Sequence, residues 1–289
     1  MSKRKKAIII VNAYARELYT RQVRRIKDEL EKRGVEVEAK RNGAFLLSTE
    51  SDEKPDCDFI VYLDKDKYAA RLLEKRNLRL FNNAAAIEVC DDKMLTHIAL
   101  DGAGIKMPET IPGLLCYYDD ATPDKNYLDG VERRLGYPVI VKMSHGSLGG
   151  GVFKADNRNE LDGISEKVKL YPHLFQKYIA SSHGRDMRVI VIGDEVVGGI
   201  LRSSTGDFRS NIGLGGKAEK CDVPEDVAAT ALKIQKLLGL DYCGMDFLLG
   251  ETPLLCEVNS NAFFDAFEDV TGLDVAGKYA EHIIATISK

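Results

Sequence analysis

Acidic and amide side chains recur at short intervals in residues 243–261, CGMDFLLGETPLLCEVNSN. The Gly-Glu-Thr-Pro loop in this stretch predicts a β-hairpin in which residue 249 pairs with 254, residue 248 with 255 and residue 246 with 257. Asp246 and Glu257 then lie opposite each other on one face, and Asn259 points the same way. Carboxylate and amide oxygens suit Mg²⁺ held together with substrate phosphates, so we predict that these three residues bind a metal ion.

The competing interpretation is that these are polar positions on the exposed face of an amphipathic hairpin. Two like charges directly across a strand pair destabilise a sheet unless a cation lies between them. The apolar runs FLL and PLLC beside the acidic residues indicate burial, which favours the metal site. A softer transition metal would need a cluster of His or Cys ligands, which this hairpin does not offer.

A second candidate feature is the glycine-rich stretch at residues 142–155, KMSHGSLGGGVFKA, which has four glycines between positions 146 and 151. The residues before and after it read as strands, and neither a P-loop nor a GxGxxG pattern opening a helix is present. Taken alone, the stretch is best interpreted as a long hairpin loop. Together with the acidic pair about a hundred residues later, it predicts a flap whose N–H groups and Lys142 hold a nucleoside triphosphate.

The first ninety residues carry no catalytic constellation of their own. Apolar runs and amphipathic spacing predict strands at residues 7–11, 35–39, 58–62 and 78–81, and helices at 21–33 and 67–75. Alternation of strands with helices predicts a parallel α/β sheet.

The rest of the chain reads as a mixture of helices and hairpins. A helix follows Asp91, and another starts at Thr122-Pro123-Asp124, with Thr122 as the cap and proline at the first position, and ends at Gly136. Strands flank the glycine stretch and cover residues 174–179. RVIVI-GD-EVVGGILR is a hairpin pattern, and helices are predicted at 223–238 and 273–287.

Size and charge restrict the class of protein. A chain of 289 residues is long enough for about two domains. The net charge of −4 gives no indication of a nucleic-acid-binding surface, and the apolar runs are too short to predict a membrane span. The chain starts with basic residues, and the apolar run AIIIV that follows them is shorter than the apolar segment of a signal peptide. We therefore interpret this run as a buried strand. The cysteines are scattered singly, as is typical of a reducing compartment, and we predict a cytoplasmic protein.

The motifs KMSHGSLGGGV, FQKYI, GRDMRVIVIGDEVV, GDFRSN, GMDFL and EVNSN occur in this order. In sequence and spacing they resemble the ATP-grasp superfamily, and most closely its RimK-like branch, which includes ATP-dependent glutamate ligases. The resemblance spans roughly residues 91–289. It implies an α/β, ATP-grasp fold with three parts: a parallel α/β pre-ATP-grasp domain (1–90), a subdomain with the glycine-rich lid (91–182), and a subdomain with the metal site (183–289). Two antiparallel sheets would clasp the nucleotide between them.

The resemblance also assigns roles to individual residues. It implies that Arg202 and Arg209 face the phosphate and the acyl group as catalytic residues. Asp246, Glu257 and Asn259 would hold Mg²⁺, with two ions expected and Mn²⁺ as a substitute. The implied ATP contacts are Lys93, Lys142, Gly146, Ser147, Gly149, Gly150, Gly151, Gln176, Lys177, Tyr178, Ile179, Asp186, Arg209 and Asn211. Among these, Lys177 and Tyr178 would form the adenine hinge, and Asp186 would lie near the ribose. The simpler alternatives are that Lys93 is a helix-surface charge and Arg202 an ordinary strand-end charge.

The implied reaction joins a carboxylate to an amine at the expense of ATP. A carboxylate attacks the γ-phosphate to give an acyl phosphate, and an amine such as that of glutamate then displaces phosphate. The partners are therefore ATP, a carboxylate acceptor and an amine, with no nucleic acid or membrane, and the resemblance allows a homo-oligomer. After EVN, this chain continues SNAFFDAFE rather than with the Ser-Pro-Gly-like turn common in RimK-type ligases. This departure leaves the substrates open, and its phenylalanines read as core residues or, alternatively, as an acceptor pocket.

Three functional hypotheses remain distinct. The first is an amino-acid ligase acting on a small molecule or a peptide end. The second is an ATP-grasp ligase that modifies a ribosomally made peptide, which a basic or aromatic groove in the first ninety residues would favour. The third is a nucleotide-binding module without turnover, and an ATP-grasp phosphotransferase is a further variant.

Overall fold

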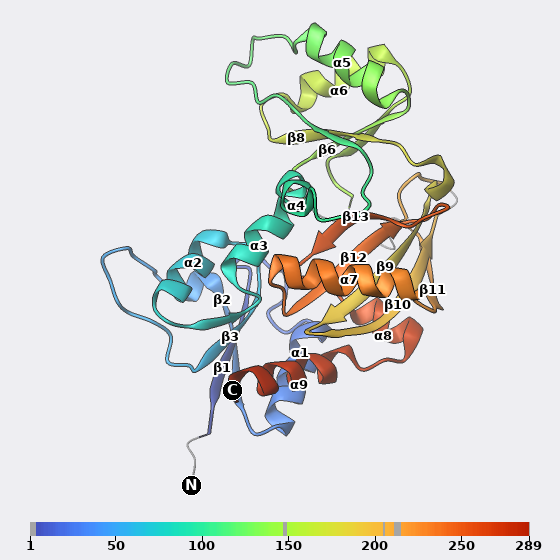
Figure 1. Cartoon of the computed structure of the whole chain (residues 1–289). Helices are drawn as coiled ribbons and strands as arrows, with labels where there is room; N and C mark the ends of the chain where they lie inside the picture. Colours follow the sequence, from blue (N-terminus) through green and yellow to red (C-terminus); the bar gives the residue numbers. More distant parts are fainter. Residues whose placement is uncertain (1–3, 147–148, 205, 211–214, 289) are drawn as a thin grey trace.

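The computed structural model describes residues 4–146, 149–204, 206–210 and 215–288. Three sheets follow one another along this part of the chain, and helices cover them (Figure 1). Each sheet lies within one of the three segments expected from the sequence. The boundaries between those segments remain a proposal.

The first sheet is parallel and has the strand order β2-β1-β3-β4. Its strands are β1 (Lys6–Val11), β2 (Glu36–Arg41), β3 (Phe59–Leu63) and β4 (Arg79–Phe81), with helices α1 (Arg21–Lys32) and α2 (Lys67–Lys75) and the short 3₁₀ helix η1 (Asn42–Ala44). The predicted parallel α/β pattern is confirmed. The strand order reverses between β1 and β3, and in such sheets ligands bind in the crevice outside the carboxyl ends of the strands at that point.

The second sheet is antiparallel, with the order β5-β8-β6-β7. Its strands are β5 (Thr110–Pro112), β6 (Val139–Met143), β7 (Val152–Ala155) and β8 (His173–Lys177), and its helices are α5 (Lys125–Leu135) and α6 (Arg158–Val168). The glycine-rich stretch joins β6 to β7, as predicted. The predicted start of α5 is wrong, because Asp124 and not Thr122 is the cap: its side chain accepts a hydrogen bond from the amide of Tyr127.

The third sheet has the order β11-β10-β9-β12-β13 and is antiparallel throughout. Its strands are β9 (Arg185–Ile192), β10 (Glu195–Ser203), β11 (Lys217–Cys221), β12 (Tyr242–Leu248) and β13 (Leu254–Asn259). Both predicted hairpins, β9–β10 and β12–β13, are present. Helix α7 (Glu225–Leu238) packs on the face that carries Val189 and Met245. Because side chains alternate along a strand, the residues between these, such as Arg188 and Asp246, point to the opposite face.

Helices α3 (Ala84–Asp91) and α4 (Lys93–Leu100) connect the first sheet to the second, while η2 (Ala180–Ser182) leads into β9. At the end of the chain, α8 (Asp265–Thr271) and α9 (Val275–Ile287) return to the first sheet, and α9 packs against α1 (Figure 1). One hydrophobic core therefore contains Ile9 of β1, Ile190 of β9 and Tyr279 of α9. The two ends of the chain form a common body around the site.

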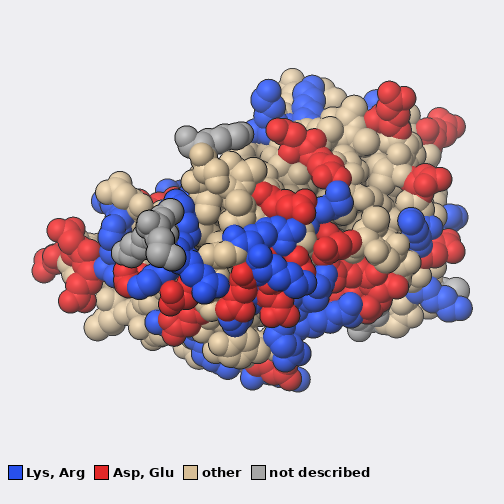
Figure 2. Space-filling view, turned by 90° about the horizontal axis from the view of Figure 1, so that it is seen from below, with Lys and Arg blue, Asp and Glu red and all other residues tan. Residues whose placement is uncertain are grey.

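Figure 2 shows the face that lies below in Figure 1, where basic and acidic side chains are interspersed. This face therefore offers no block of a single charge to a polyanion. No helix among the described residues is both long enough and apolar enough to cross a bilayer.

Candidate functional site

A cleft of about 540 Å³ is lined by residues from all three sheets. Most of the described residues that the sequence singled out line it: Lys93, Lys142, Gly146, Gly149, Gly150, Gln176, Lys177, Tyr178, Ile179, Asp186, Arg202, Arg209, Asp246, Glu257 and Asn259. Gly151 is not among the lining residues. Ser147 and Asn211 lie outside the described residues. The acidic hairpin and the glycine-rich stretch thus face one common cavity.

The acidic pair has the predicted geometry, but the hairpin register differs nearer the turn. Asp246 pairs with Glu257 as expected, whereas Phe247 pairs with Leu255 and Leu248 with Leu254. The predicted pairs 248–255 and 249–254 are wrong, because Cys256 is an extra residue that forms a β-bulge in β13. The bulge places Cys256 in the cleft wall beside the acidic residues.

Two arginines neutralise Asp246, which is 6% exposed. Arg188 donates from Nε and Nη2 to its two carboxylate oxygens at 2.7 and 2.8 Å, and Arg202 Nη2 lies 2.8 Å from Oδ2. Burial alone would raise the pKa of Asp246, but the two guanidinium groups hold it below its usual range. Asp246 is therefore a buried carboxylate that stays ionised, not a surface residue of an amphipathic hairpin.

The oxygen set of the hairpin still fits a magnesium ion. A carboxylate offers about four lone-pair positions, and the arginines use three of those of Asp246. Glu257 is a third exposed, and its nearest cation, Lys93 Nζ, lies 3.7 Å from Oε1. Asn259 Oδ1 accepts a hydrogen bond from the amide of Asn261, and one lone pair remains. The described residues contain no group of three or more His, Cys, Asp and Glu side chains suited to a metal, so an amide oxygen must complete this set.

A second buried ion pair adjoins the first. Arg202, 4% exposed, donates to both oxygens of Asp186 at 2.7 and 2.6 Å, and Ser210 Oγ also donates to Asp186. Burial and the neighbouring Asp246 raise the pKa of Asp186, against the opposing influence of Arg202 and Ser210. Arg202 thus bridges Asp186 and Asp246 and is not a strand-end surface charge. Both carboxylate oxygens of Asp186 already accept hydrogen bonds from Arg202, and the expected contact of Asp186 with the ribose stays a prediction.

The glycine-rich stretch uses backbone conformations that favour glycine. Gly146, Gly149 and Gly151 have φ values of +135°, +77° and +74°. A Cβ on Gly151 would lie 2.9 Å from Sδ of Met143, and the Gly151 carbonyl accepts a hydrogen bond from the Met143 amide. Gly151 therefore closes the β6–β7 hairpin, while Gly146, Gly149 and Gly150 face the cleft.

Basic side chains connect this stretch to the rest of the site. Lys93 Nζ, on the largely buried first residue of α4, donates to the carbonyl of Gly146 at 3.1 Å. Arg209 Nη1 donates to the carbonyl of Gly149 at 2.8 Å, and its other nitrogens bind Asp207. Lys142 Nζ, from β6, lies 3.4 Å from Sγ of Cys256. Lysines or arginines from three separate segments therefore line the cleft beside the glycine-rich stretch and the acidic hairpin.

Residues 176–179 form the wall where the adenine hinge is expected. The Lys177 amide donates to the carbonyl of Glu109, so the adenine hinge expected at Lys177 and Tyr178 cannot use that N–H group. The Tyr178 hydroxyl bonds to Nδ1 of His183. Gln176 is 2% exposed, and its amide nitrogen bonds to His97 Nε2 and Thr110 Oγ1.

Several lining residues were not found from the sequence. Arg188 is two residues after Asp186 and hence on the same strand face, a signal that was present in GRDMR. Asn12 and Asp64 follow β1 and β3 at the point where the strand order reverses, and Asn12 Nδ2 donates to Asp64 Oδ1 at 3.1 Å. Among the phenylalanines of SNAFFDAFE, Phe264 and Phe267 are core residues, while Phe263 is exposed and lines the cleft. The core interpretation is confirmed for Phe264 and Phe267, whereas an acceptor pocket at Phe263 stays a prediction.

Comparison with known proteins agrees with this geometry. Residues 90–283 match the model of the RimK-like ATP-grasp domain. N-acetylaspartylglutamate synthase A of Homo sapiens is 37% identical over 231 residues, which are 78% of this chain and 58% of that protein. The ribosomal protein bS6–L-glutamate ligase of Escherichia fergusonii is 36% identical over 214 residues, 73% of this chain and 69% of that protein. This chain spans less than two thirds of the length of the human synthase.

Solved structures show the same fold. The RimK domain ATP-grasp protein of Sphaerobacter thermophilus superimposes with a TM-score of 0.74 at 20% identity, over 96% of this chain and 98% of that one. The ATP-grasp ligase PsnB, solved with a phosphomimetic variant of its minimal precursor, Mg and ADP, gives 0.71 at 18% identity, over 96% and 97% of the two chains. ATP-grasp enzymes use ATP and Mg²⁺. With the motifs in one cleft and the family model covering residues 90–283, the chain belongs to the RimK-like ATP-grasp family.

Proposed function

We propose that this protein is an ATP-dependent carboxylate–amine ligase that forms an amide bond through an acyl phosphate. The observation that carries this proposal is the convergence of Asp246, Glu257 and Asn259 with the glycine-rich stretch on one cleft. A structural hairpin with a surface-facing acidic pair would not direct these oxygens at the same cavity as Lys93 and Lys142. The reaction needs no protein nucleophile, because positioning and charge neutralisation are sufficient for phosphoryl transfer.

The lysines and glycines that line the cleft would hold the triphosphate. Lys142 and Lys93 are largely buried, so their charges act in a medium that screens them less than water does. Glycine N–H groups would donate to phosphate oxygens, as backbone amides do in other anion sites. Lys177 and Tyr178 would form the adenine hinge through backbone groups, next to Ile179. For Ser147 and Asn211 the ATP contact remains a proposal from the sequence alone.

Asp246, Glu257 and Asn259 would hold Mg²⁺, with two ions as the expected number and Mn²⁺ as a substitute. When bound, the metal supplies charge neutralisation at the phosphate oxygens. Arg188 and Arg202 keep Asp246 ionised and so available as a ligand. Arg209, which already reaches the glycine-rich stretch, would neutralise charge that develops on the transferred phosphoryl group.

The two other substrates would occupy the end of the cleft that the first sheet contributes. The crevice at the carboxyl ends of β1 and β3 opens into the cleft through Asn12 and Asp64, where parallel sheets bind their ligands. Glutamate is the proposed amine, since two relatives are named for products or substrates that contain glutamate. The carboxylate substrate would then be small, or the end of a peptide. We place the reaction in the cytoplasm, in keeping with the six free thiols.

The test is a turnover assay with the purified chain, Mg-ATP and pooled amino acids, with and without pooled carboxylates. ADP, phosphate and new amides are measured together. Amide formation that needs both an amine and a carboxylate supports the ligase, and deconvolution of the pools then tests glutamate. ADP formation with phosphorylated product and no amide would indicate a phosphotransferase instead. Tight Mg-ATP binding without turnover in any combination would indicate a binding module.

A peptide-modifying ligase is the second candidate, because PsnB has the same fold and was solved with the precursor peptide PsnA2. Fold likeness at 18% identity does not extend to substrate. The assay therefore includes peptides with free carboxyl ends and peptides with blocked ends. Product from an end-blocked peptide that contains acidic side chains would favour this candidate over the leading one.

A further inference from the structure

Asn82, between β4 and α3, reaches across to the two strands that carry the proposed metal ligands. Its side chain is 2% exposed. Nδ2 donates to the carbonyls of Tyr242 and Ser260, both at 2.7 Å. Oδ1 accepts from the amides of Asp241 and Tyr242 at 2.6 and 3.1 Å. One residue of the first α/β segment therefore binds the beginning of β12 and the residue that follows the end of β13.

The geometry of Asn82 leaves none of its bonding capacity unused. A carboxamide has two N–H donors and one oxygen with two lone pairs, and all four positions are occupied. Replacing either end would leave buried carbonyls or amides without a partner, which is more costly than the loss of an ordinary hydrogen bond. Ser260 directly follows Asn259, so this contact fixes the backbone next to a proposed metal ligand.

The turn after Asn259 is also held at the Ala262 carbonyl, by two donors. Gln22 of α1 donates from Nε2 to the Ala262 carbonyl at 3.3 Å, and the Tyr242 hydroxyl donates to the same carbonyl at 2.6 Å. The turn also fixes the ligand itself, because the Asn261 amide donates to Asn259 Oδ1 at 3.1 Å. The orientation of the Asn259 amide thus depends on the path of residues 260–262, and side chains from the first ninety residues hold that path.

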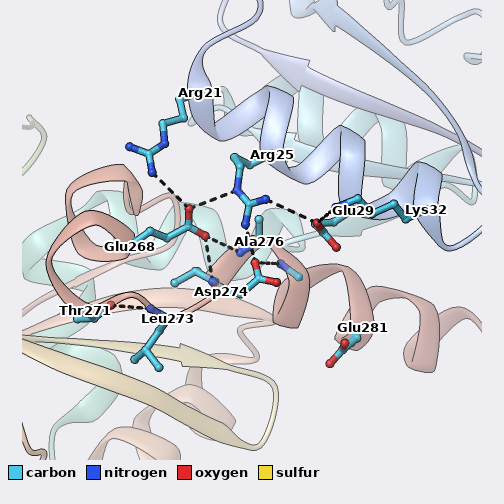
Figure 3. Close-up of polar contacts among 12 residues, drawn as sticks. Arg21, Arg25, Glu29, Lys32, Glu268, Thr271, Leu273, Asp274, Ala276 and Glu281 are labelled. Atoms are coloured by element: carbon cyan, nitrogen blue, oxygen red, sulfur yellow. Dashed lines mark hydrogen bonds and ion pairs between the residues drawn. The ribbon is translucent and has the colours of Figure 1, made fainter.

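Helix α8, which follows this turn, is held by the same part of the chain (Figure 3). Arg25 of α1 lies between Glu29 on its own helix and Glu268 and Asp274 on the other side, at 3.6, 3.4 and 2.7 Å. Glu268 in turn accepts hydrogen bonds from the amides of Val275 and Ala276 at the start of α9. The segment between β13 and α9 therefore has contacts with α1 at both of its ends.

We propose that the first α/β segment is a positioning part of the metal site, and that Asn82 is its main positioning residue. This inference rests on the proposed function, because it presumes that Asn259 binds a metal held with the nucleotide. Asn82 does not touch the metal, the nucleotide or the reacting atoms. It sets the backbone from which Asn259 projects, as residues behind metal ligands do in other proteins.

Asn82→Asp tests the proposal with almost no change in volume. The aspartate keeps the oxygen that accepts from residues 241 and 242, but it loses the two N–H donors to Ser260 and Tyr242. Asn83→Asp is the matched control. Asn83 Nδ2 donates across the same interface to the Gly239 carbonyl at 2.7 Å, while its Oδ1 caps α3. Aspartate preserves the cap, so Asn83→Asp removes one contact between the same two parts of the chain, away from β13.

The readout is the dissociation constant of a non-hydrolysable ATP analogue, measured by calorimetry with and without saturating Mg²⁺. The constant without Mg²⁺ divided by the constant with Mg²⁺ reports the contribution of the metal to binding without any turnover. Asn82→Asp should reduce this ratio about 10-fold or more and leave binding of the metal-free analogue unchanged. Asn83→Asp should behave as the wild type. Circular dichroism at the measuring temperature establishes that each variant is folded.

Gln22→Met covers the case in which Asn82→Asp does not fold, since it removes one donor to the same turn and keeps the length of the side chain. It should reduce the ratio about 3-fold. Wild-type ratios in the folded Asn82→Asp variant, or in Gln22→Met if that is the folded one, would overturn the proposal, as would an equal loss in Asn83→Asp. If the wild-type chain itself binds the analogue without any dependence on Mg²⁺, the proposed function fails, and that result is distinct from the others.

Discussion

Asp246 shows how one carboxylate can be buried, ionised and still available. Burial opposes its charge, and the guanidinium groups of Arg188 and Arg202 restore it. One lone-pair position of its carboxylate remains for the set completed by Glu257 and Asn259, so the arginines form a fixed counter-charge rather than a substitute for the metal. Glu257 differs, because it is more exposed and has one lysine at 3.7 Å. The contact between Glu257 and Lys93 can therefore give way to a metal ion, and this exchange has only a small desolvation cost.

Glu257→Ala therefore tests the metal assignment at the scale of one residue. The variant should lose about 100-fold or more in kcat/KM, because it lacks a ligand of the metal ion that would neutralise phosphate charge. Its free energy of unfolding should change by less than about 1 kcal/mol, since the side chain fills no core volume. ADP release and urea denaturation measure the two quantities.

The control for this variant is Glu251→Ala, at the exposed turn of the same hairpin. Glu251→Ala should leave both activity and stability near wild-type values. Near-normal turnover in Glu257→Ala would show that Glu257 is not a metal ligand, whatever its place in the cleft.

At the scale of elements, α4 and β8 meet through a pair of polar side chains. His97 of α4 is 8% exposed, and its Nε2 faces the side-chain nitrogen of Gln176 on β8 at 3.1 Å. An amide nitrogen donates, so Nε2 must be the unprotonated acceptor. Burial, with a smaller influence of Lys142, lowers the pKa of His97 to about 4. The contact that orients Gln176 in the cleft wall therefore requires a neutral imidazole.

This contact predicts a loss of stability in mild acid. The unfolded chain binds a proton at His97 near its ordinary pKa of about 6.5, whereas the folded chain does so near 4. The contribution of His97 to the free energy of unfolding is therefore fully present above a pH of about 6.5. It decreases by about 3 kcal/mol in total as the pH falls toward about 4. Urea unfolding at a series of pH values measures it.

His97→Gln is the comparison, because an amide can still accept from Gln176 and does not titrate. Its free energy of unfolding should fall less steeply over the same pH range than that of the wild type. Identical slopes for the two proteins would contradict the assignment of His97 as a buried neutral group.

At the scale of the whole molecule, the third sheet is shared between two bodies of helices. One face packs on α7, and the other meets α8, α9 and the first α/β segment in a common core. The cleft opens where this second face is not covered by apolar side chains, and there the alternation of β9 and β12 presents Asp186, Arg188 and Asp246. The arrangement makes the first sheet a structural part of the site and not an appended domain.

The ion pairs between α1 and the last two helices predict how strongly these parts are joined. Arg25→Met leaves Glu268, which is 7% exposed at its side chain, with weaker compensation of its charge. The free energy of unfolding should fall by about 1–3 kcal/mol, because a buried partner loses its nearest cation. Thermal or urea denaturation measures the loss.

Arg24→Met is the matched control on the same helix, since Arg24 is exposed. Its effect should stay within about 0.5 kcal/mol. An equal effect of the two substitutions would show that the cluster around Arg25 is solvated and contributes little to joining the ends of the chain.

The sequence by itself determined the elements and the local part of the site. Alternating and helical periodicity predicted the parallel first sheet, both hairpins, the Asp246–Glu257 pair and the glycine turn between β6 and β7, because each of these depends on residues close together in the chain. A one-residue bulge at Cys256 escaped prediction, since periodicity indicates which residues pair on average and not where an extra residue is accommodated. The capping of α5 by Asp124 was missed for a similar reason, as two residues on either side of Pro123 could each serve as the cap.

Tertiary structure alone decided how charge is balanced and how the ligands are oriented. Arg188 and Arg202 reach Asp246 from β9 and β10, and Asn82 reaches Ser260 across 178 residues of sequence. Such contacts follow from the packing of whole elements, which no local pattern of residues encodes. The chemistry of the site was therefore legible in the sequence, whereas the restraints that hold its ligands in place became visible in the folded chain.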